Sequence, residues 1–301
     1  MKNSRFTHPL IKLILSLMLY FACFFIVSRY GNAGLILVLQ KTGIRRLSSY
    51  AAASIRMLGV LIPMILVCIV IRQEKVFFLR SKSFWNGLFV GGYMLFYSAF
   101  AFVAVLSGAE AFQDKNTILF SVLYFILAGI TEELVFRGIT ADLLIQFFLK
   151  KNSDQEADTS ESKSGISSGV IPAVVTSGII FSLAHGINIR SAAVSGVLIQ
   201  MAGSFIMGMF LTAVYYRTGN IYAVIFLHVL NNIAAAISTV IVNSEESISD
   251  VISGYGMSNL IYLIPYFAVL IFILRPVKQK EIRNLWMNRI NGDLSEIHPY
   301  H

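Results

Sequence analysis

The sequence predicts an all-α protein that crosses a membrane several times, and its composition supports this prediction. Charged residues make up only 13% of the 301 positions, while hydrophobic residues make up 56% and the mean hydropathy is +0.71. A soluble domain carries about 25% charged residues, so this chain lacks the charge needed to cover a water-facing surface of its size. The composition therefore excludes a soluble globular enzyme and a disordered chain.

Segments of about 20 mainly apolar residues can each span the hydrocarbon core of a membrane as a helix. The sequence contains eight such segments, near residues 9–28, 50–71, 85–107, 117–141, 168–186, 192–215, 220–242 and 257–275. We therefore expect a bundle of about eight transmembrane helices, because a helix satisfies its own backbone hydrogen bonds in lipid. Both cysteines, Cys23 and Cys68, lie in apolar segments, so no disulfide framework is expected.

The spans divide the chain into three parts. Residues 1–116 hold about three N-terminal spans, residues 117–242 hold the next four, and residues 243–301 hold the last span and a basic tail. Within the middle part, residues 151–169 are polar and rich in serine, with few large apolar side chains. That composition is typical of a flexible loop.

The Lys and Arg residues indicate how the spans are oriented. With the N-terminus in the cytoplasm, the cytoplasmic segments hold 16 basic residues and the segments on the opposite side hold six. Basic residues concentrate in cytoplasmic loops, so we expect both termini in the cytoplasm of a multi-pass cell-membrane protein, bacterial or archaeal in type. The net charge of +8 then reflects topology, and we expect the lipid bilayer, and no nucleic acid, as a partner.

Ionisable side chains inside spans are costly and usually functional, and the fourth span carries three of them. Glu133 and Arg137 are four residues apart, so they share a helical face and can pair. Glu132 points about 100° away and has no local cation. This arrangement predicts one carboxylate for acid/base chemistry and one structural ion pair. The alternative interpretation is a satisfied ion pair at a membrane boundary.

Two histidines lie in later spans. His185, near the end of the fifth span, shares a face with Phe181, and His228, in the seventh span, shares a face with Asn232. The Asn232 amide could orient the imidazole, bind a metal or donate to an oxyanion. The structural alternatives are a helix cap for His185 and interhelical hydrogen bonds for His228 and Asn232. The predicted span limits also place Glu132 and His185 at opposite ends of their spans, and so at different depths.

These segments supply a carboxylate, two imidazoles and an amide at membrane depth. Glu132 could take a proton from water while histidine and Asn232 stabilise a tetrahedral oxyanion. Alternatively, Glu132, His185 and His228 could bind Zn²⁺ or another divalent metal, with water completing the site. The residues leave metal-dependent and metal-free hydrolysis open, and the cofactor is unknown.

The spacing of these residues resembles the CPBP family of intramembrane proteases, which comprises CAAX proteases and bacteriocin-processing enzymes and is also called Abi. The family has three motifs in order, Glu-Glu-x-x-x-Arg, Phe-x-x-x-His and His-x-x-x-Asn/Asp. In this chain they read Glu132-Glu133-x-x-x-Arg137, Phe181-x-x-x-His185 and His228-x-x-x-Asn232. The resemblance covers roughly residues 117–240 and therefore places the family core in spans 4–7.

The resemblance implies an intramembrane endopeptidase. It implies that Glu132 and His185 activate water, and that His228 and Asn232 stabilise the oxyanion or bind a metal. Glu133, Arg137 and Phe181 would support the site. The substrate implied is a membrane-associated peptide or protein, such as a prenylated CAAX protein or a bacteriocin-related peptide.

Two other functions are compatible with the same residues. A proton-coupled transporter uses carboxylate and histidine relays in the membrane, although no inverted repeat of the kind found in such carriers is evident. A catalytically idle bacteriocin-immunity protein that only binds a peptide is the second alternative.

Overall fold

The computed structural model describes residues 8–42, 49–71, 81–109, 111–158, 169–242 and 248–291. Within these ranges the chain is helical, and the sole β feature is an isolated bridge between Phe112 and Val242. The prediction of an all-α polytopic fold is confirmed.

The α-helices follow one another along the whole chain. In order they are α1 (Pro9–Thr42), α2 (Ser49–Val70), α3 (Ser81–Val90), α4 (Gly92–Leu106), α5 (Lys115–Glu133), α6 (Asp142–Asp158), α7 (Val170–His185), α8 (Val194–Thr218), α9 (Ile221–Ala235), α10 (Ile237–Val240), α11 (Ile248–Ser253), α12 (Leu263–Ile273) and α13 (Pro276–Asn291). Three further segments are the π-helix η3 (Leu134–Ala141) and the 3₁₀-helices η4 (Gly186–Arg190) and η5 (Met257–Leu260).

Fewer helices than predicted are long enough to span a membrane. In the described part of the chain, five helices are long and apolar enough, or seven if each of two bent pairs counts as one span. One bent pair consists of α3 and α4. The other consists of the segment Met257–Ile273, which includes α12, and α13; each pair is bent by 67°. The predicted span 220–242 corresponds to α9, which has only 15 residues. Its length of about 22 Å falls short of a hydrocarbon core of about 30 Å.

The predicted fourth span, 117–141, was too short. The helical segments α5, η3 and α6 follow one another without a break from Lys115 to Asp158, and Lys115–Lys151 qualifies as one span. The predicted loop at 151–169 is therefore helical through Asp158, while residues 159–168 lie outside the described residues. Residues 150–158 contain no glycine or proline, so nothing stops a helix that begins in a buried apolar stretch.

The long helix places Glu132 and His185 at the same depth, contrary to the prediction. The chain returns to α7 at Gly169, where φ is +71° and a Cβ would lie 2.9 Å from the backbone of Phe148. Glu132 precedes Phe148 by 16 residues, and His185 follows Gly169 by 16 residues. Both residues therefore lie about 24 Å from that contact along neighbouring antiparallel helices.

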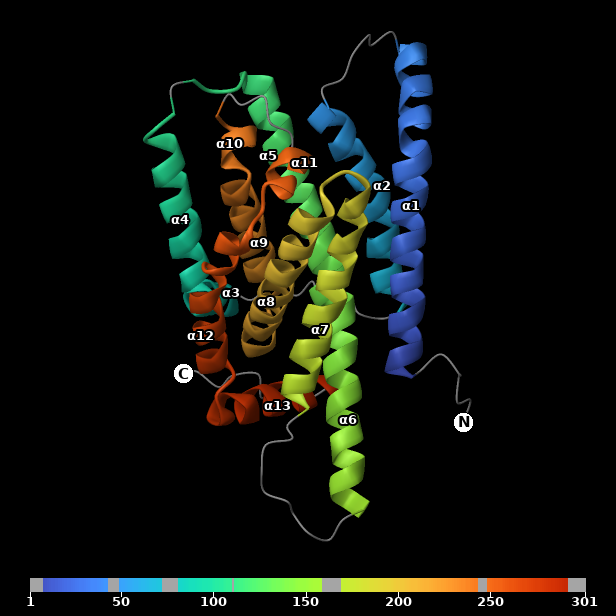
Figure 1. The fold of residues 1–301 in the computed structure, drawn as a ribbon. Coiled ribbons are helices and arrows are strands. Elements are labelled where there is room, and N and C mark those ends of the chain that lie inside the picture. Colours follow the sequence, from blue (N-terminus) through green and yellow to red (C-terminus); the bar gives the residue numbers. More distant parts are fainter. Residues whose placement is uncertain are drawn as a thin grey trace.

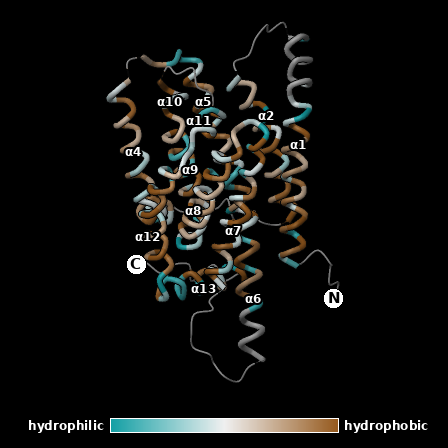
Figure 2. The backbone as a smooth tube through the Cα atoms, viewed as in Figure 1, coloured by the Kyte–Doolittle hydropathy of each residue, from teal (hydrophilic) through white to brown (hydrophobic). Residues whose placement is uncertain are grey.

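The helices form one bundle with α5, α7, α8 and α9 in the middle (Figure 1). Helices α1 and α2 cover one side of this centre, α4 and α12 cover the other, and α13 lies across the end at which α1 begins. Figure 2 shows mostly hydrophobic residues along the coloured part of α1 and along α4 and α12, and hydrophilic residues gathered at α13. The central helices thus hold the site, and the outer helices present apolar side chains to lipid.

A tight turn brings α9 back beside α8. Gly219 adopts a φ of +62° at the end of α8, and the side chain of Asn220 accepts a hydrogen bond from the Ala223 amide at 3.1 Å. A left-handed glycine followed by an Asn N-cap ends one helix and starts the next. This turn directs His228 back toward α5.

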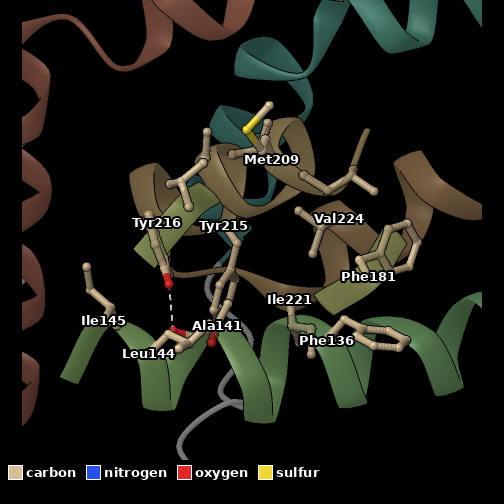
Figure 3. Close-up of a cluster of buried hydrophobic side chains, with 14 of the residues drawn as sticks. Phe136, Ala141, Leu144, Ile145, Phe181, Met209, Tyr215, Tyr216, Ile221 and Val224 are labelled. Carbon is tan, nitrogen blue, oxygen red and sulfur yellow. Dashed lines mark hydrogen bonds between the residues drawn. The ribbon is translucent and has the colours of Figure 1, made fainter. Parts of the chain in front are cut away.

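Buried aromatic side chains hold η3 against α8 (Figure 3). The Tyr216 hydroxyl donates a hydrogen bond to the Ala141 carbonyl oxygen at 2.6 Å, and Trp286 Nε1 donates to the Tyr216 carbonyl oxygen at 3.0 Å. Trp286 is only 1% exposed, so α13 is anchored to the core by this ring. The end of the π-helix is therefore fixed from two other parts of the chain.

Candidate active site

A glycine lets α5 and α9 approach closely at the site. A Cβ at Gly129 would lie 2.5 Å from Cγ2 of Val229, which is closer than two carbon atoms can approach without displacement. Glu133 lies one helical turn beyond Gly129, and His228 is the neighbour of Val229. The close approach therefore brings the carboxylates of α5 to the imidazole of α9.

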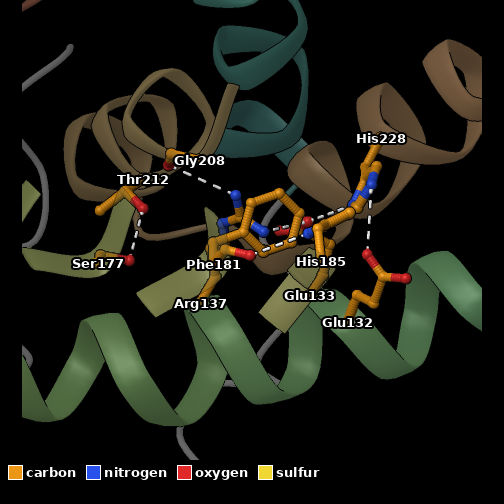
Figure 4. A network of polar contacts seen from close by, with 9 residues as sticks. All are labelled: Glu132, Glu133, Arg137, Ser177, Phe181, His185, Gly208, Thr212 and His228. Atoms are coloured by element: carbon orange, nitrogen blue, oxygen red, sulfur yellow. Dashed lines mark hydrogen bonds and ion pairs between the residues drawn. The ribbon is translucent and has the colours of Figure 1, made fainter. Parts of the chain in front are cut away.

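Glu133 joins Arg137 to His228 in the buried centre of the bundle (Figure 4). Its Oε1 atom lies 2.6 Å from Arg137 Nη1 and 2.5 Å from His228 Nδ1, and the Glu133 and Arg137 side chains are 0% exposed. An ionised carboxylate only accepts hydrogen bonds, so Nδ1 of His228 is the donor. Glu133 thereby fixes the orientation of the imidazole and leaves Nε2 for other partners.

Glu132 faces the other nitrogen of the same imidazole. Its Oε2 atom lies 3.6 Å from His228 Nε2, and its side chain is 25% exposed, whereas that of Glu133 is fully buried. Oε2 of each glutamate has no hydrogen-bond partner among the described residues. The two adjacent glutamates thus differ in exposure and in ion pairing, as the sequence predicts, and Glu132 is the carboxylate that is partly open to its surroundings.

Arg137 lies in the π-helix η3 and is enclosed by α7 and α8. Its Nη2 atom donates to the Gly208 carbonyl oxygen at 3.4 Å, and its guanidinium lies 4.4 Å from the centroid of the Phe181 ring. A Cβ at Gly208 would lie 3.0 Å from Cδ1 of Phe181, so glycine keeps this packing close. A π-helical turn often marks a functional site, and here it directs Arg137 at Glu133.

Phe181 also packs against both histidines. Its ring centroid lies 4.7 Å from that of His185 and 5.8 Å from that of His228, both in edge-to-face geometry. His185 Nδ1 is bonded to the Phe181 carbonyl oxygen at 2.9 Å. A carbonyl oxygen can only accept, so Nδ1 carries the hydrogen and Nε2 is free to accept a proton. His185 also interacts electrostatically with Glu132 and His228.

The structure thus brings together all but one of the side chains that the sequence singles out. The group comprises Glu132, Glu133, Arg137, Phe181, His185 and His228. The remaining candidate, Asn232, is half-buried on α9 one turn beyond His228. No hydrogen bond joins its amide to another residue in the part of the chain that the structure describes. Its neighbour Asn231 is buried and accepts from the Tyr266 hydroxyl at 3.4 Å.

The bond between Glu133 and His228 was not expected from the sequence. The two residues are 95 positions apart, so spacing gives no signal for it. Gly129 and Gly208 are likewise parts of the site that sequence reasoning missed. A glycine in an apolar helix has a packing role only once its neighbour is known.

The side chains do not form a ready-made metal site. In the described ranges, no group of three or more His, Cys, Asp or Glu side chains is placed to hold a metal ion. Nδ1 of His228 is engaged by Glu133, and Nδ1 of His185 is engaged by a backbone carbonyl. These contacts leave Nε2 of each ring available, as in histidines that ligate metals, so it is the placement of Glu132, His185 and His228, and not their chemistry, that does not fit a bound metal in this arrangement.

One comparison with known proteins gives a match to the core of this chain. Residues 114–234 match the family model described as type II CAAX prenyl endopeptidase Rce1-like. This segment runs from the N-cap of α5 to α9 and contains every candidate site residue, and it confirms the resemblance to the CPBP family. No curated protein and no solved structure gives a significant match.

Proposed function

We propose that this chain, whose residues 114–234 form an Rce1-like domain of the CPBP family, cleaves its substrate with Glu132 as the general base. The family supports intramembrane endopeptidase activity. The observation that carries the mechanism is the Glu132 carboxylate, which lies 3.6 Å from a histidine that Glu133 and Arg137 hold in place. A carboxylate beside an oriented imidazole can supply both the base and the stabilising charge for hydrolysis.

The first step is the attack of water on the scissile carbonyl. Glu132 accepts a proton from the water while the water oxygen bonds to the carbonyl carbon. Nε2 of His185 carries no hydrogen and can share in accepting that proton. Proton transfer to a positioned side chain contributes about 10²- to 10⁴-fold to such reactions.

The second step is the stabilisation and collapse of the tetrahedral intermediate. With both ring nitrogens protonated, His228 would donate from Nε2 to the oxyanion while Glu133 compensates the charge on the ring through Nδ1. Asn232, one turn away on the same helix face, would be a second donor. When the C–N bond breaks, Glu132 returns its proton to the leaving amine.

The substrate class follows from the family and from the location of the site. We propose a membrane-associated peptide, with a prenylated CAAX peptide as the first probe because the matched family is that of CAAX prenyl endopeptidases. The same peptide without its prenyl group tests whether the lipid is recognised. A bacteriocin-related peptide serves as a second probe.

The decisive experiment measures cleavage of these fluorogenic peptides by the full chain in proteoliposomes. We expect Glu132→Gln to lower the rate at least about 100-fold while the protein still accumulates in the membrane. Glu281→Gln is the matched control, because Glu281 lies on α13 and pairs with Arg217 and Lys278. Full activity in Glu132→Gln would refute the assignment of the base, and parallel assays with a chelator and with added Zn²⁺ test metal dependence directly.

A further inference from the structure

A tyrosine outside the matched segment lies beside the proposed base. Tyr20 is on α1, which packs against η3, and its side chain is only 7% exposed. Its ring contacts Phe136 edge to face, with centroids 5.7 Å apart and an interplanar angle of 81°. Phe136 lies four residues after Glu132, so the two share a helix face. Tyr20 therefore covers the face of the helix from which Glu132 projects.

A second tyrosine lies on that same face. Tyr124 precedes Glu132 by eight residues, which is close to two helical turns. The phenol of Tyr20 interacts electrostatically with Glu132 and with Tyr124, and Tyr124 interacts with Glu132. The Glu132 carboxylate thus has the His228 imidazole as one neighbour and the phenols of Tyr20 and Tyr124 as others.

The charged and titratable groups around Glu132 come from several helices. They include His228 of α9, His185 of α7, Arg137 of η3, Tyr124 of α5 and Tyr20 of α1, and Tyr50 and Arg56 of α2 act on Tyr124. Of Tyr20 and Tyr124, Tyr20 is the more deeply buried. It is also the one supplied by a helix that the matched segment does not include. A buried phenol normally directs its hydroxyl to a polar partner.

We propose that Tyr20 is a positioning residue for Glu132 and the attacking water. The phenol and the carboxylate interact electrostatically, Oε2 of Glu132 has no hydrogen-bond partner among the described residues, and a water molecule can bridge two such polar groups. In that position the Tyr20 hydroxyl donates to the water while Glu132 accepts its proton. The inference rests on the proposed function, because it assumes that Glu132 is the base.

The test replaces Tyr20 by Phe, which keeps the ring on Phe136 and removes only the hydroxyl. In the proteoliposome assay we expect kcat to fall at least about 10-fold while KM changes less than about 2-fold, because Tyr20 acts on the water and not on substrate binding. Tyr30→Phe on the same helix is the matched control, since Tyr30 is 62% exposed. The stability of each variant is measured by denaturant titration in the same detergent.

A double variant tests whether Tyr20 acts through Glu132. If it does, Tyr20→Phe combined with Glu132→Gln is no slower than Glu132→Gln alone, because residues that act as a unit are not additive. The inference is overturned if Tyr20→Phe keeps the wild-type kcat, if it changes KM alone, or if its loss in kcat simply follows a loss of stability. A wild-type chain that cleaves no probe would instead overturn the proposed function.

Discussion

The same substitution, Glu to Gln, should lower the stability of the fold at Glu133 and the rate of cleavage at Glu132. Glu133→Gln keeps the shape of the side chain but removes the charge that faces Arg137 at 2.6 Å and His228 at 2.5 Å. Arg137 is 0% exposed, so its guanidinium would remain buried without the carboxylate that contacts it. Removal of one partner from a buried ion pair destabilises a protein by about 3–5 kcal/mol. We therefore expect Glu133→Gln to lose most of its folded population under mild denaturation.

Glu132→Gln should behave differently. The Glu132 side chain is 25% exposed, and its ion-pair contact is with the titratable His228 imidazole at 3.6 Å. A partly exposed pair of this kind contributes about 0–1 kcal/mol, so the folded state should be almost unaffected. The catalytic rate should nevertheless fall at least about 100-fold, because the proton acceptor is gone.

Both quantities can be measured on the same samples. Unfolding of the purified variants by sodium dodecyl sulfate in mixed micelles gives the change in the free energy of unfolding. The reporter-peptide assay gives the rate per folded molecule. A Glu133→Gln variant as stable as the wild type, or a strongly destabilised Glu132→Gln variant, would refute the division of roles between the two carboxylates.

Three further predictions concern residues that position the site. Gly129→Ala should lower stability by about 1–3 kcal/mol and slow cleavage, because the new Cβ would lie 2.5 Å from Cγ2 of Val229; Val229→Ala in the same chain should restore both. Trp286→Phe should destabilise the fold by about 1 kcal/mol in a denaturant titration, since it removes the hydrogen bond to the Tyr216 carbonyl at 3.0 Å. Hydrogen bonds hold the pKa of Asp114 below its usual value, and the largest effect comes from the hydroxyl of Thr117. The stabilising effect of Asp114 is therefore complete above the ordinary Asp pKa and is lost as the pH falls through the lowered value, and Asp114→Asn should remove that acid dependence from a pH series of unfolding curves.

Each of these has a matched control or a contrary outcome. Gly92→Ala serves for Gly129, because no atom lies within 4 Å of a Cβ built at Gly92. A Trp286→Phe variant with unchanged stability would show that α13 is not anchored by its indole. An Asp114→Asn variant that loses stability in acid as the wild type does would place the titrating group elsewhere.

Much of the fold was predictable because lipid imposes a simple rule. A chain with 13% charged residues and long apolar segments can satisfy its backbone in a membrane only as helices or a closed barrel. The limits of the helices were less predictable. Hydropathy marks where a segment leaves the apolar region, whereas the helix from Lys115 to Asp158 continues past that point. The short helix α9 has the opposite problem, since its apolar sequence extends beyond its end at Ala235.

The sequence by itself determined which side chains to examine. Charge is so costly in lipid that the few ionisable groups within the spans mark the site, and the spacing of Glu133 and Arg137 predicts their ion pair, which the structure confirms at 2.6 Å. The resemblance to the CPBP family rests on the same residues, and the match to residues 114–234 confirms it.

Only the tertiary structure decided which partners each of those side chains has. The bond from Glu133 to His228 links residues 95 positions apart. The contact of Tyr20 with Phe136 joins a helix outside the matched segment to a helix inside it. Such contacts depend on which helix faces pack and how closely, and the packing is set by glycines such as Gly129. The spacing of residues along one helix does not show which residues of another helix contact them. The partners of each carboxylate are therefore evident only in the folded bundle.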